Sequence, residues 1–135
     1  MNTKTCLIVC GPTAIGKTSY GIELAIRHNT AIISADSRQC FKELNIGVAK
    51  PSDEQLRKAK HYFINSHSIH DEVNVRIFEE YALKTVNSIF EKNDVAIMVG
   101  GTGLYIKAFA EGLDEIPEVN ESLRKGINKN YSIIV

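Results

Sequence analysis

The sequence predicts an α/β fold with a mostly parallel sheet, and three observations predict it. Residues 5–10, 30–34 and 94–99 form short, continuous apolar runs rich in β-forming side chains. They lack the polar alternation of a half-exposed strand, so we expect strands that are buried on both faces. Segments with helical periodicity alternate with these runs. Strands that alternate with helices are joined by right-handed crossovers and lie parallel to one another.

The first two helices follow from local signals. Residues 17–27 come directly after a glycine-rich turn, and Ile22, Ala25 and Ile26 are available to face the sheet. After a loop over residues 41–50, Ser52 and Gln55 have the spacing of a capping box. That spacing predicts a helix of about two turns.

The remaining elements are read from periodicity. Residues 74–93 are the clearest helix, because apolar side chains recur three, four and one residues apart and form one stripe. The stripe consists of Val75, Phe78, Ala82, Val86, Ile89 and Phe90. We also expect helices over residues 103–111 and, from a weaker pattern, over residues 119–128. Residues 131–135 are apolar and resemble a strand.

The length predicts one α/β domain over residues 1–135, in which residues 45–75 form a partly separate helical or loop insertion. Three strands and a short final one are fewer than the roughly five to six of an average sheet. The chain therefore has the pattern of the front part of a longer protein. A small complete domain with a frayed tail is the alternative.

Composition says more about the cellular compartment of the protein than about its function. Lysine plus arginine and aspartate plus glutamate both number 16, so bulk charge argues neither for nor against a nucleic-acid partner. The three cysteines show no metal-ligand spacing, which favours a reduced, cytoplasmic protein. The apolar run at residues 6–10 is too short for a signal peptide or a membrane span.

A complete phosphate-binding motif joins the first predicted strand to the first helix. The pattern G-x-x-x-x-G-K-[ST] is filled by Gly11, Pro12, Thr13, Ala14, Ile15, Gly16, Lys17 and Thr18. Glycines let the backbone wrap an anion, and the loop N–H groups and helix N-terminus supply a positive field. Lys17 would contact terminal phosphates and Thr18 would bind Mg²⁺. The motif refines the fold class to a three-layer fold of the P-loop NTPase type.

The P-loop does not decide the reaction, since hydrolases, kinases and transferases share it. The third strand ends in Gly100, Gly101 and Thr102 and carries no carboxylate to hold a magnesium-bound water. That absence weakens a motor or GTPase interpretation.

Two further turns follow strands and should face the same crevice, because ligands of parallel sheets bind at the carboxyl ends of the strands. Asp36 follows the second strand and has the chemistry of a general base or a magnesium ligand. A turn or N-cap aspartate is the alternative. Thr102 follows the third strand, with a helix N-cap as its alternative.

The motifs together resemble one family. GPTAIGKT, ADSRQ, NIGVAKP and GGTGLYIKA are similar in order and spacing to the N-terminal half of the tRNA dimethylallyltransferases. The similarity runs from about residue 6 to residue 124, and HSIHDEVNVRIF resembles the family segment that leads into its swinging domain.

The resemblance implies transfer of a dimethylallyl group from dimethylallyl diphosphate to N6 of the adenosine beside the tRNA anticodon. It implies that residues 11–18 hold the diphosphate with Mg²⁺, with Lys17 on the leaving group and Thr18 on the metal. It makes Asp36 the base for the adenine amino group and Thr102 a polar contact near the reacting centre. Ser37, Arg38, Gln39 and Arg124 then contact tRNA together with Asp36 and Thr102.

Three other functions stay open on the sequence. The chain could be an isopentenyltransferase for free adenine nucleotides, a small-molecule P-loop kinase, or a non-catalytic protein that binds diphosphate only. The family's second half carries further basic residues, and this chain of 135 residues ends before them.

Overall fold

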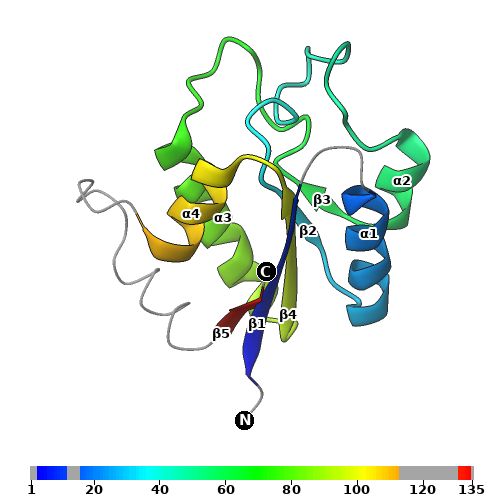
Figure 1. Ribbon diagram of the computed structural model, residues 1–135, viewed down its shortest axis with the longest axis vertical. Coiled ribbons are helices and arrows are strands. Elements are labelled where there is room, and N and C mark those ends of the chain that lie inside the picture. Colours follow the sequence, from blue (N-terminus) through cyan, green and yellow to red (C-terminus); the bar gives the residue numbers. More distant parts are fainter. Residues whose placement is uncertain (1–2, 12–15, 113–130, 135) are drawn as a thin grey trace.

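The computed structural model describes residues 3–11, 16–112 and the backbone of residues 131–134. Its centre is a sheet in which every pairing of neighbouring strands is parallel (Figure 1). The strand order across the sheet is β3-β2-β4-β1-β5. The strands are β1 (Lys4–Cys10), β2 (Ile32–Ser34), β3 (His61–Tyr62), β4 (Val95–Gly100) and β5 (Tyr131–Ile134).

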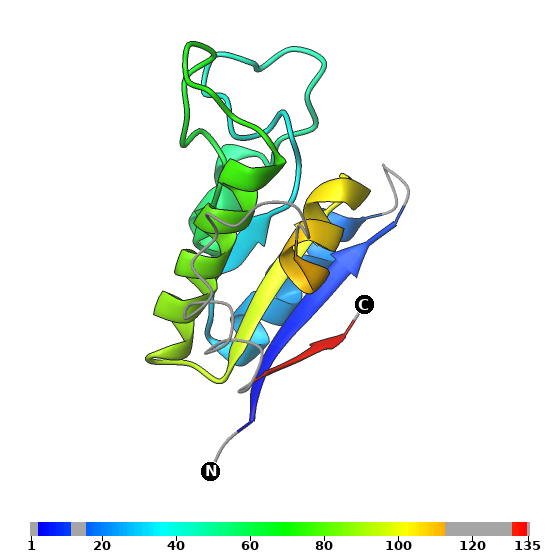
Figure 2. The same cartoon turned by 90° about the vertical axis from the view of Figure 1, so that its left-hand side faces the viewer.

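Helices cover both faces of the sheet and confirm the three-layer α/β fold. Helices α1 and α2 lie on one face and α3 and α4 on the other (Figures 1 and 2). The helices are α1 (Lys17–His28), α2 (Asp53–Lys58), α3 (Val75–Phe90) and α4 (Gly103–Glu111). The loops that follow β2 and β3 project beyond the carboxyl ends of the strands (Figure 2).

Strand β4 shows why the apolar runs carry no alternation. Ala96 and Met98 are fully buried in the cluster formed with α3 and α4, whereas Ile97 between them is buried in the cluster formed with α1. Successive side chains of a strand point to opposite faces, so a strand covered on both faces needs apolar residues at every position.

The predicted stripe of the long helix is confirmed, with its boundaries revised. Phe78, Ala82 and Val86 are fully buried under the sheet. Helix α3 begins after Asn74, whose side chain accepts a hydrogen bond from the backbone N–H of Ile77 at 2.9 Å. It ends at Phe90, three residues before the expected boundary, because the following amides turn back to the carbonyls of Ser88 and Ile89. The capping box predicted at Ser52 and Gln55 is present and starts α2.

One expectation for α1 is wrong. Ile22 and Ala25 are buried against the sheet, but Ile26 is 58% exposed. Gly21 explains the difference, because a Cβ atom at this position would stand 2.5 Å from Cγ2 of Val99. The helix therefore approaches β4 most closely at Gly21, and Ile26 lies outside the buried arc.

Strand β3 was not predicted, and the second strand is shorter than expected. β3 has two residues, which pair with Ile32 and Ile33 of β2. A pair of residues is too short to carry a periodic signal. β2 begins at Ile32 because the backbone of Thr30 is still bonded to Ala25 of α1. The helix expected over residues 119–128 lies outside the described residues.

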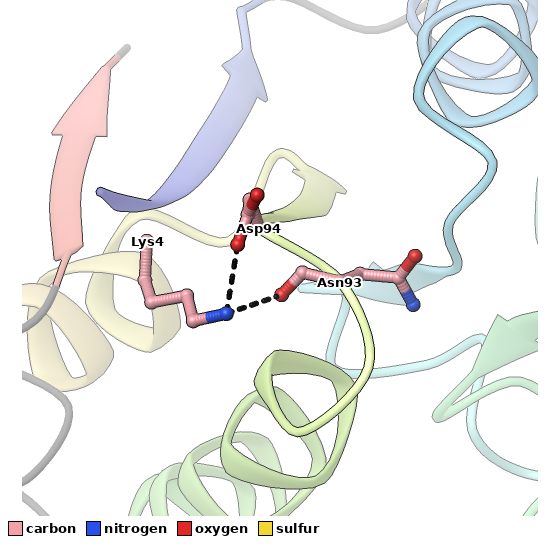
Figure 3. Close-up of polar contacts among 3 residues, drawn as sticks. All are labelled: Lys4, Asn93 and Asp94. Atoms are coloured by element: carbon pink, nitrogen blue, oxygen red, sulfur yellow. Dashed lines mark hydrogen bonds and ion pairs between the residues drawn. The ribbon is translucent and has the colours of Figure 1, made fainter. Parts of the chain in front are cut away.

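Strands β1 and β4 are joined at their starts by an ion pair. The Lys4 ammonium donates to Oδ1 of Asp94 at 2.8 Å and to the carbonyl oxygen of Asn93 at 3.3 Å (Figure 3). The N–H of Thr5 donates to the carbonyl of Asp94 in the same place. These contacts fix the register in which Thr5 lies beside Val95 and Cys10 beside Gly100. The carboxyl ends of the two strands are thereby placed level with each other.

Candidate functional site: the carboxyl edge of the sheet

The turns after β1, β2 and β4 meet at one edge of the sheet, as the sequence predicts. Lys17 begins α1, and its ammonium donates to the carbonyl oxygen of Gly11 at 2.7 Å. A Cβ atom at Gly101 would stand 3.1 Å from the Lys17 ammonium. The ammonium therefore lies between Gly11, at the end of β1, and Gly101, in the turn after β4.

Helix α1 starts after a glycine. Gly16 precedes it with φ 80°, a left-handed conformation that glycine adopts without strain. Because the N-cap residue is glycine, it offers no side-chain cap to this helix. The first amides of a helix have no partner within it, so they attract an anionic ligand. Pro12, Thr13, Ala14 and Ile15 lie outside the described residues.

Asp36 forms the turn that follows β2. Its Oδ1 atom accepts hydrogen bonds from the backbone N–H groups of Arg38 at 2.8 Å and Gln39 at 3.1 Å. Asp36 therefore makes the hydrogen bonds expected of a turn aspartate, the alternative that the sequence left open. Both bonds use Oδ1, so they orient the carboxylate without engaging Oδ2.

Thr102 joins the turn after β4 to the turn that carries Asp36. It occupies the N-cap position of α4, but its side chain makes no capping hydrogen bond. Instead, Oγ1 accepts from the N–H of Ser37 at 3.2 Å, and the Thr102 N–H donates to the carbonyl of Ala35 at 3.2 Å. The predicted N-cap alternative is therefore correct in position only. The contact to Ser37 could not be read from the sequence, since the two residues are 65 positions apart.

Gln39 is half-buried, and both ends of its amide are hydrogen-bonded. Ser34 donates its hydroxyl to Oε1 at 2.8 Å, and Nε2 donates to the carbonyl of Ala49 at 2.8 Å. Arg38 beside it is exposed. Arg124 lies outside the described residues.

A pocket of about 200 Å³ opens at this edge and contains part of the predicted site. Gly16, Lys17, Thr18, Asp36 and Gln39 line it. The other lining residues come mainly from β2, β4, the loop before α2 and the region of β3: Ser19, Ile32, Ser34, Ala49, Pro51, His61, Ile64, Val99, Gly100 and Gly101. Of the predicted residues that the structure describes, Gly11, Ser37, Arg38 and Thr102 lie outside this lining.

His61 is a pocket residue that the sequence analysis did not assign to the site. Its Nδ1 atom lies 3.0 Å from the carbonyl oxygen of Ala59, so this nitrogen carries the proton. Burial lowers the pKa of the imidazole, which favours the neutral ring. No sequence signal placed it in the site, because it begins β3, a strand that the sequence did not predict.

The pocket has the donor set for magnesium bound through phosphates. Thr18 and Ser34 present hydroxyl groups and Asp36 presents a carboxylate. Such oxygen ligands suit Mg²⁺, which takes few protein ligands and completes its shell with phosphate oxygens and water. In the part of the chain that the structure describes, histidine, cysteine, aspartate and glutamate side chains form no cluster of three that would hold a metal by themselves.

We expect one fast-reacting thiol in the native protein. Burial raises the pKa of Cys6 to about 12 and that of Cys40 to about 11. Both thiols stay protonated and shielded at pH 8, whereas Cys10 is exposed. Ellman's reagent at pH 8 should therefore label one thiol in buffer and all three in urea, and Cys10→Ser should remove the fast signal. Rapid native labelling of Cys6 would contradict the burial.

Comparisons with known proteins identify the family. Residues 39–133 match the family model described as IPP transferase. The tRNA dimethylallyltransferase of Cytophaga hutchinsonii is 47% identical over 128 residues, which are 95% of this chain and 42% of the relative. The crystal structure of the tRNA isopentenylpyrophosphate transferase from Bacillus halodurans is similar with a TM-score of 0.77 and 29% identity, over 93% of this chain and 43% of that one.

A second structure agrees with the first. The corresponding transferase from Staphylococcus epidermidis has a TM-score of 0.75 and 33% identity, over 93% of this chain and 42% of that chain. This chain thus spans about two fifths of the length of the relatives that it matches. Within the described residues, no helix combines the length and the apolar character needed to cross a bilayer. With the family model matched over residues 39–133, the chain belongs to the IPP transferase family.

Proposed function

We propose that this chain takes part in tRNA modification by binding dimethylallyl diphosphate and transferring its prenyl group to N6 of the adenosine next to the anticodon. One observation carries the proposal: Lys17, suited to a departing diphosphate, and Asp36, suited to an amine nucleophile, line the same pocket. The choice of substrates follows the names of the relatives, which are tRNA dimethylallyltransferases and tRNA isopentenylpyrophosphate transferases. The proposal places the protein in the cytoplasm with tRNA.

Lys17 and the N-terminus of α1 stabilise the leaving group in this proposal. Lys17 and the open N-terminus of α1 direct positive charge at the diphosphate, where negative charge develops as the allylic C–O bond breaks. Bound Mg²⁺, held by the Thr18 hydroxyl and phosphate oxygens, would supply further Lewis-acid stabilisation. The pyrophosphate leaves with the electron pair of the broken bond.

Asp36 handles the proton of the nucleophile. The N6 lone pair forms the new C–N bond, and the Asp36 carboxylate accepts the proton that the amine loses. The two backbone N–H groups that donate to Oδ1 hold the carboxylate in place, and Oδ2 is the oxygen that accepts the proton. Thr102 holds the same turn through Ser37.

The tRNA is proposed to approach this edge of the sheet from the turn after β2. Ser37, Arg38 and Gln39 belong to that turn, and Arg38 is exposed to solvent. Thr102 and Arg124 complete the proposed tRNA contacts. An adenosine inside the anticodon loop must leave its base stack before its amino group reaches Asp36.

Transfer of a radiolabelled prenyl group tests the proposal. The chain should label tRNA in the presence of Mg²⁺, and Asp36→Asn should lower the rate by about 100-fold, the usual contribution of a general base. Asp53→Asn is the matched control, because Asp53 is exposed at the start of α2. Equal rates for Asp36→Asn and the wild type would refute the assignment of Asp36 as the general base.

The same assay separates the other candidates. Labelling of AMP but not tRNA would indicate an adenylate isopentenyltransferase. Turnover of ATP without any prenyl donor would indicate a kinase. Binding of pyrophosphate with no transfer to either acceptor would indicate a protein that binds diphosphate only.

A further inference from the structure

The ammonium group of Lys50 is fully engaged within the protein. It donates to the carbonyl oxygen of Phe41 at 2.7 Å, to Oδ1 of Asn65 at 2.7 Å and to Oδ1 of Asn45 at 3.2 Å. A lysine ammonium has three N–H groups, so these three bonds use them all. All three acceptors are neutral. The geometry therefore gives Lys50 an internal role, although a lysine near a phosphate pocket suggests anion binding.

The three acceptors belong to different parts of the chain. Phe41 and Asn45 lie in the loop after β2, whereas Asn65 lies just beyond β3. Asn65 is itself tied to the site, because its N–H donates to the carbonyl of Gln39 at 3.1 Å. Phe63, next to β3, is fully buried and anchors this segment in the core. Lys50 thus ties its own loop to an anchored segment at the edge of the sheet.

The residues on either side of Lys50 form a wall of the pocket. Ala49 and Pro51 line the pocket, as does Ile64, the neighbour of Asn65. The carbonyl of Ala49 is held from the inner side by Nε2 of Gln39 at 2.8 Å. The loop is therefore fixed twice, by Gln39 from within the pocket and by Lys50 from outside it. Lys50 does not line the pocket.

The lining of the pocket combines polar and apolar side chains. Lys17 and Thr18 come from the start of α1, whereas the apolar residues Ala49, Pro51 and Ile64 come from the loops after β2 and β3. A diphosphate ester with its anionic part at Lys17 would place its organic group against the apolar wall. Inorganic pyrophosphate has no such group and would leave the wall untouched.

We propose that Lys50 is a positioning residue that holds the apolar wall of the pocket in place for the organic group of a diphosphate ester. This inference rests on the proposed function, since it takes a prenyl diphosphate as the ligand. The binding wall is ordered before the ligand arrives, so binding does not have to order it. Loss of Lys50 lowers the affinity for the ester and leaves the affinity for pyrophosphate unchanged.

Titration calorimetry with two ligands tests this. The probes are dimethylallyl thiolodiphosphate, an unreactive ester, and inorganic pyrophosphate, both with Mg²⁺. Lys50→Met should weaken binding of the ester by about tenfold, the effect expected when charged hydrogen bonds that preorganise a site are lost. Lys42→Met is the matched control, because Lys42 is an exposed lysine of the same loop. It should bind both ligands as the wild type does.

Each outcome decides the matter. Equal weakening of both ligands in Lys50→Met, or no change in either, would overturn the inference. If Lys50→Met fails to fold, Asn45→Ala decides, because it removes only the 3.2 Å acceptor and should weaken the ester selectively. A wild type that binds the ester selectively but transfers nothing would refute the proposed function and leave the role of Lys50 intact. A wild type that binds neither ligand would refute both.

Discussion

Replacing Gly100 by alanine is expected to lower the free energy of unfolding by about 3 kcal/mol or more, the upper part of the range for overpacking. A Cβ atom at Gly100 would stand 2.2 Å from the carbonyl oxygen of Ala35 and 2.6 Å from its carbonyl carbon. Both atoms are backbone, so no side-chain rotation relieves the clash. The ends of β2 and β4 would have to separate, which breaks the hydrogen bond from the Ala35 N–H to the carbonyl of Val99.

Urea denaturation followed by circular dichroism measures this effect. Gly103→Ala is the control, because a Cβ atom there meets nothing within 4 Å and the residue starts α4. Alanine at this helical position should be neutral or slightly stabilising. Similar midpoints for Gly100→Ala and Gly103→Ala would mean that the two turns are not in contact. The contact matters for function as well, since these turns carry Asp36 and Thr102.

Replacing Lys17 by methionine is expected to lower prenyl transfer by roughly 1,000-fold, as the loss of one preorganised electrostatic contact to a developing charge does. The affinity for pyrophosphate with Mg²⁺ should fall by about 10- to 100-fold, because a hydrogen bond to a charged group contributes about 1.5–3 kcal/mol. Methionine keeps the length of the side chain and removes its charge. Calorimetry gives the affinity, and labelling of tRNA gives the rate.

Lys107→Met is the matched control for Lys17→Met. Lys107 is exposed on α4 and does not line the pocket. The larger effect of Lys17→Met on transfer than on binding would place its main contribution at the departing diphosphate. Wild-type affinity and rate in Lys17→Met would refute the assignment of residues 11–18 as the diphosphate site.

The sequence predicts the layers of this fold well because they depend on local chemistry. A run such as residues 95–99 has no polar position, and only a strand covered on both faces tolerates that. Capping at Ser52 depends on residues three positions apart. β3 has no such local signal, because its two residues are ordered by pairing with β2. Ile26 was misplaced because the close approach at Gly21, which depends on Val99, decides the orientation of α1.

The candidate site likewise contains residues that the sequence predicts and residues whose contacts it does not. Lys17 begins the helix after β1 and Asp36 lies in the turn after β2, so the topology of a parallel sheet brings them together without further information. The partners of Thr102 and Gln39 are different: Ser37 lies 65 residues from Thr102 and Ala49 lies 10 residues from Gln39. Those contacts depend on how the loops fold over the sheet edge. No local pattern encodes them, and the same holds for the three acceptors of Lys50.

The pairing of β1 with β4 sets the order in which this protein is assembled during synthesis. The salt bridge at the start of the two strands joins residues 90 positions apart. At ribosomal rates of about 5–20 residues per second, β1 waits roughly 5 to 18 s for this partner to be made. Throughout that interval its apolar run has no neighbour on the side of β4, and such exposed strands associate readily with other chains. The nascent chain therefore exposes this strand until residue 100 has emerged, and the sheet edge that gathers Lys17, Asp36 and Thr102 forms only afterwards.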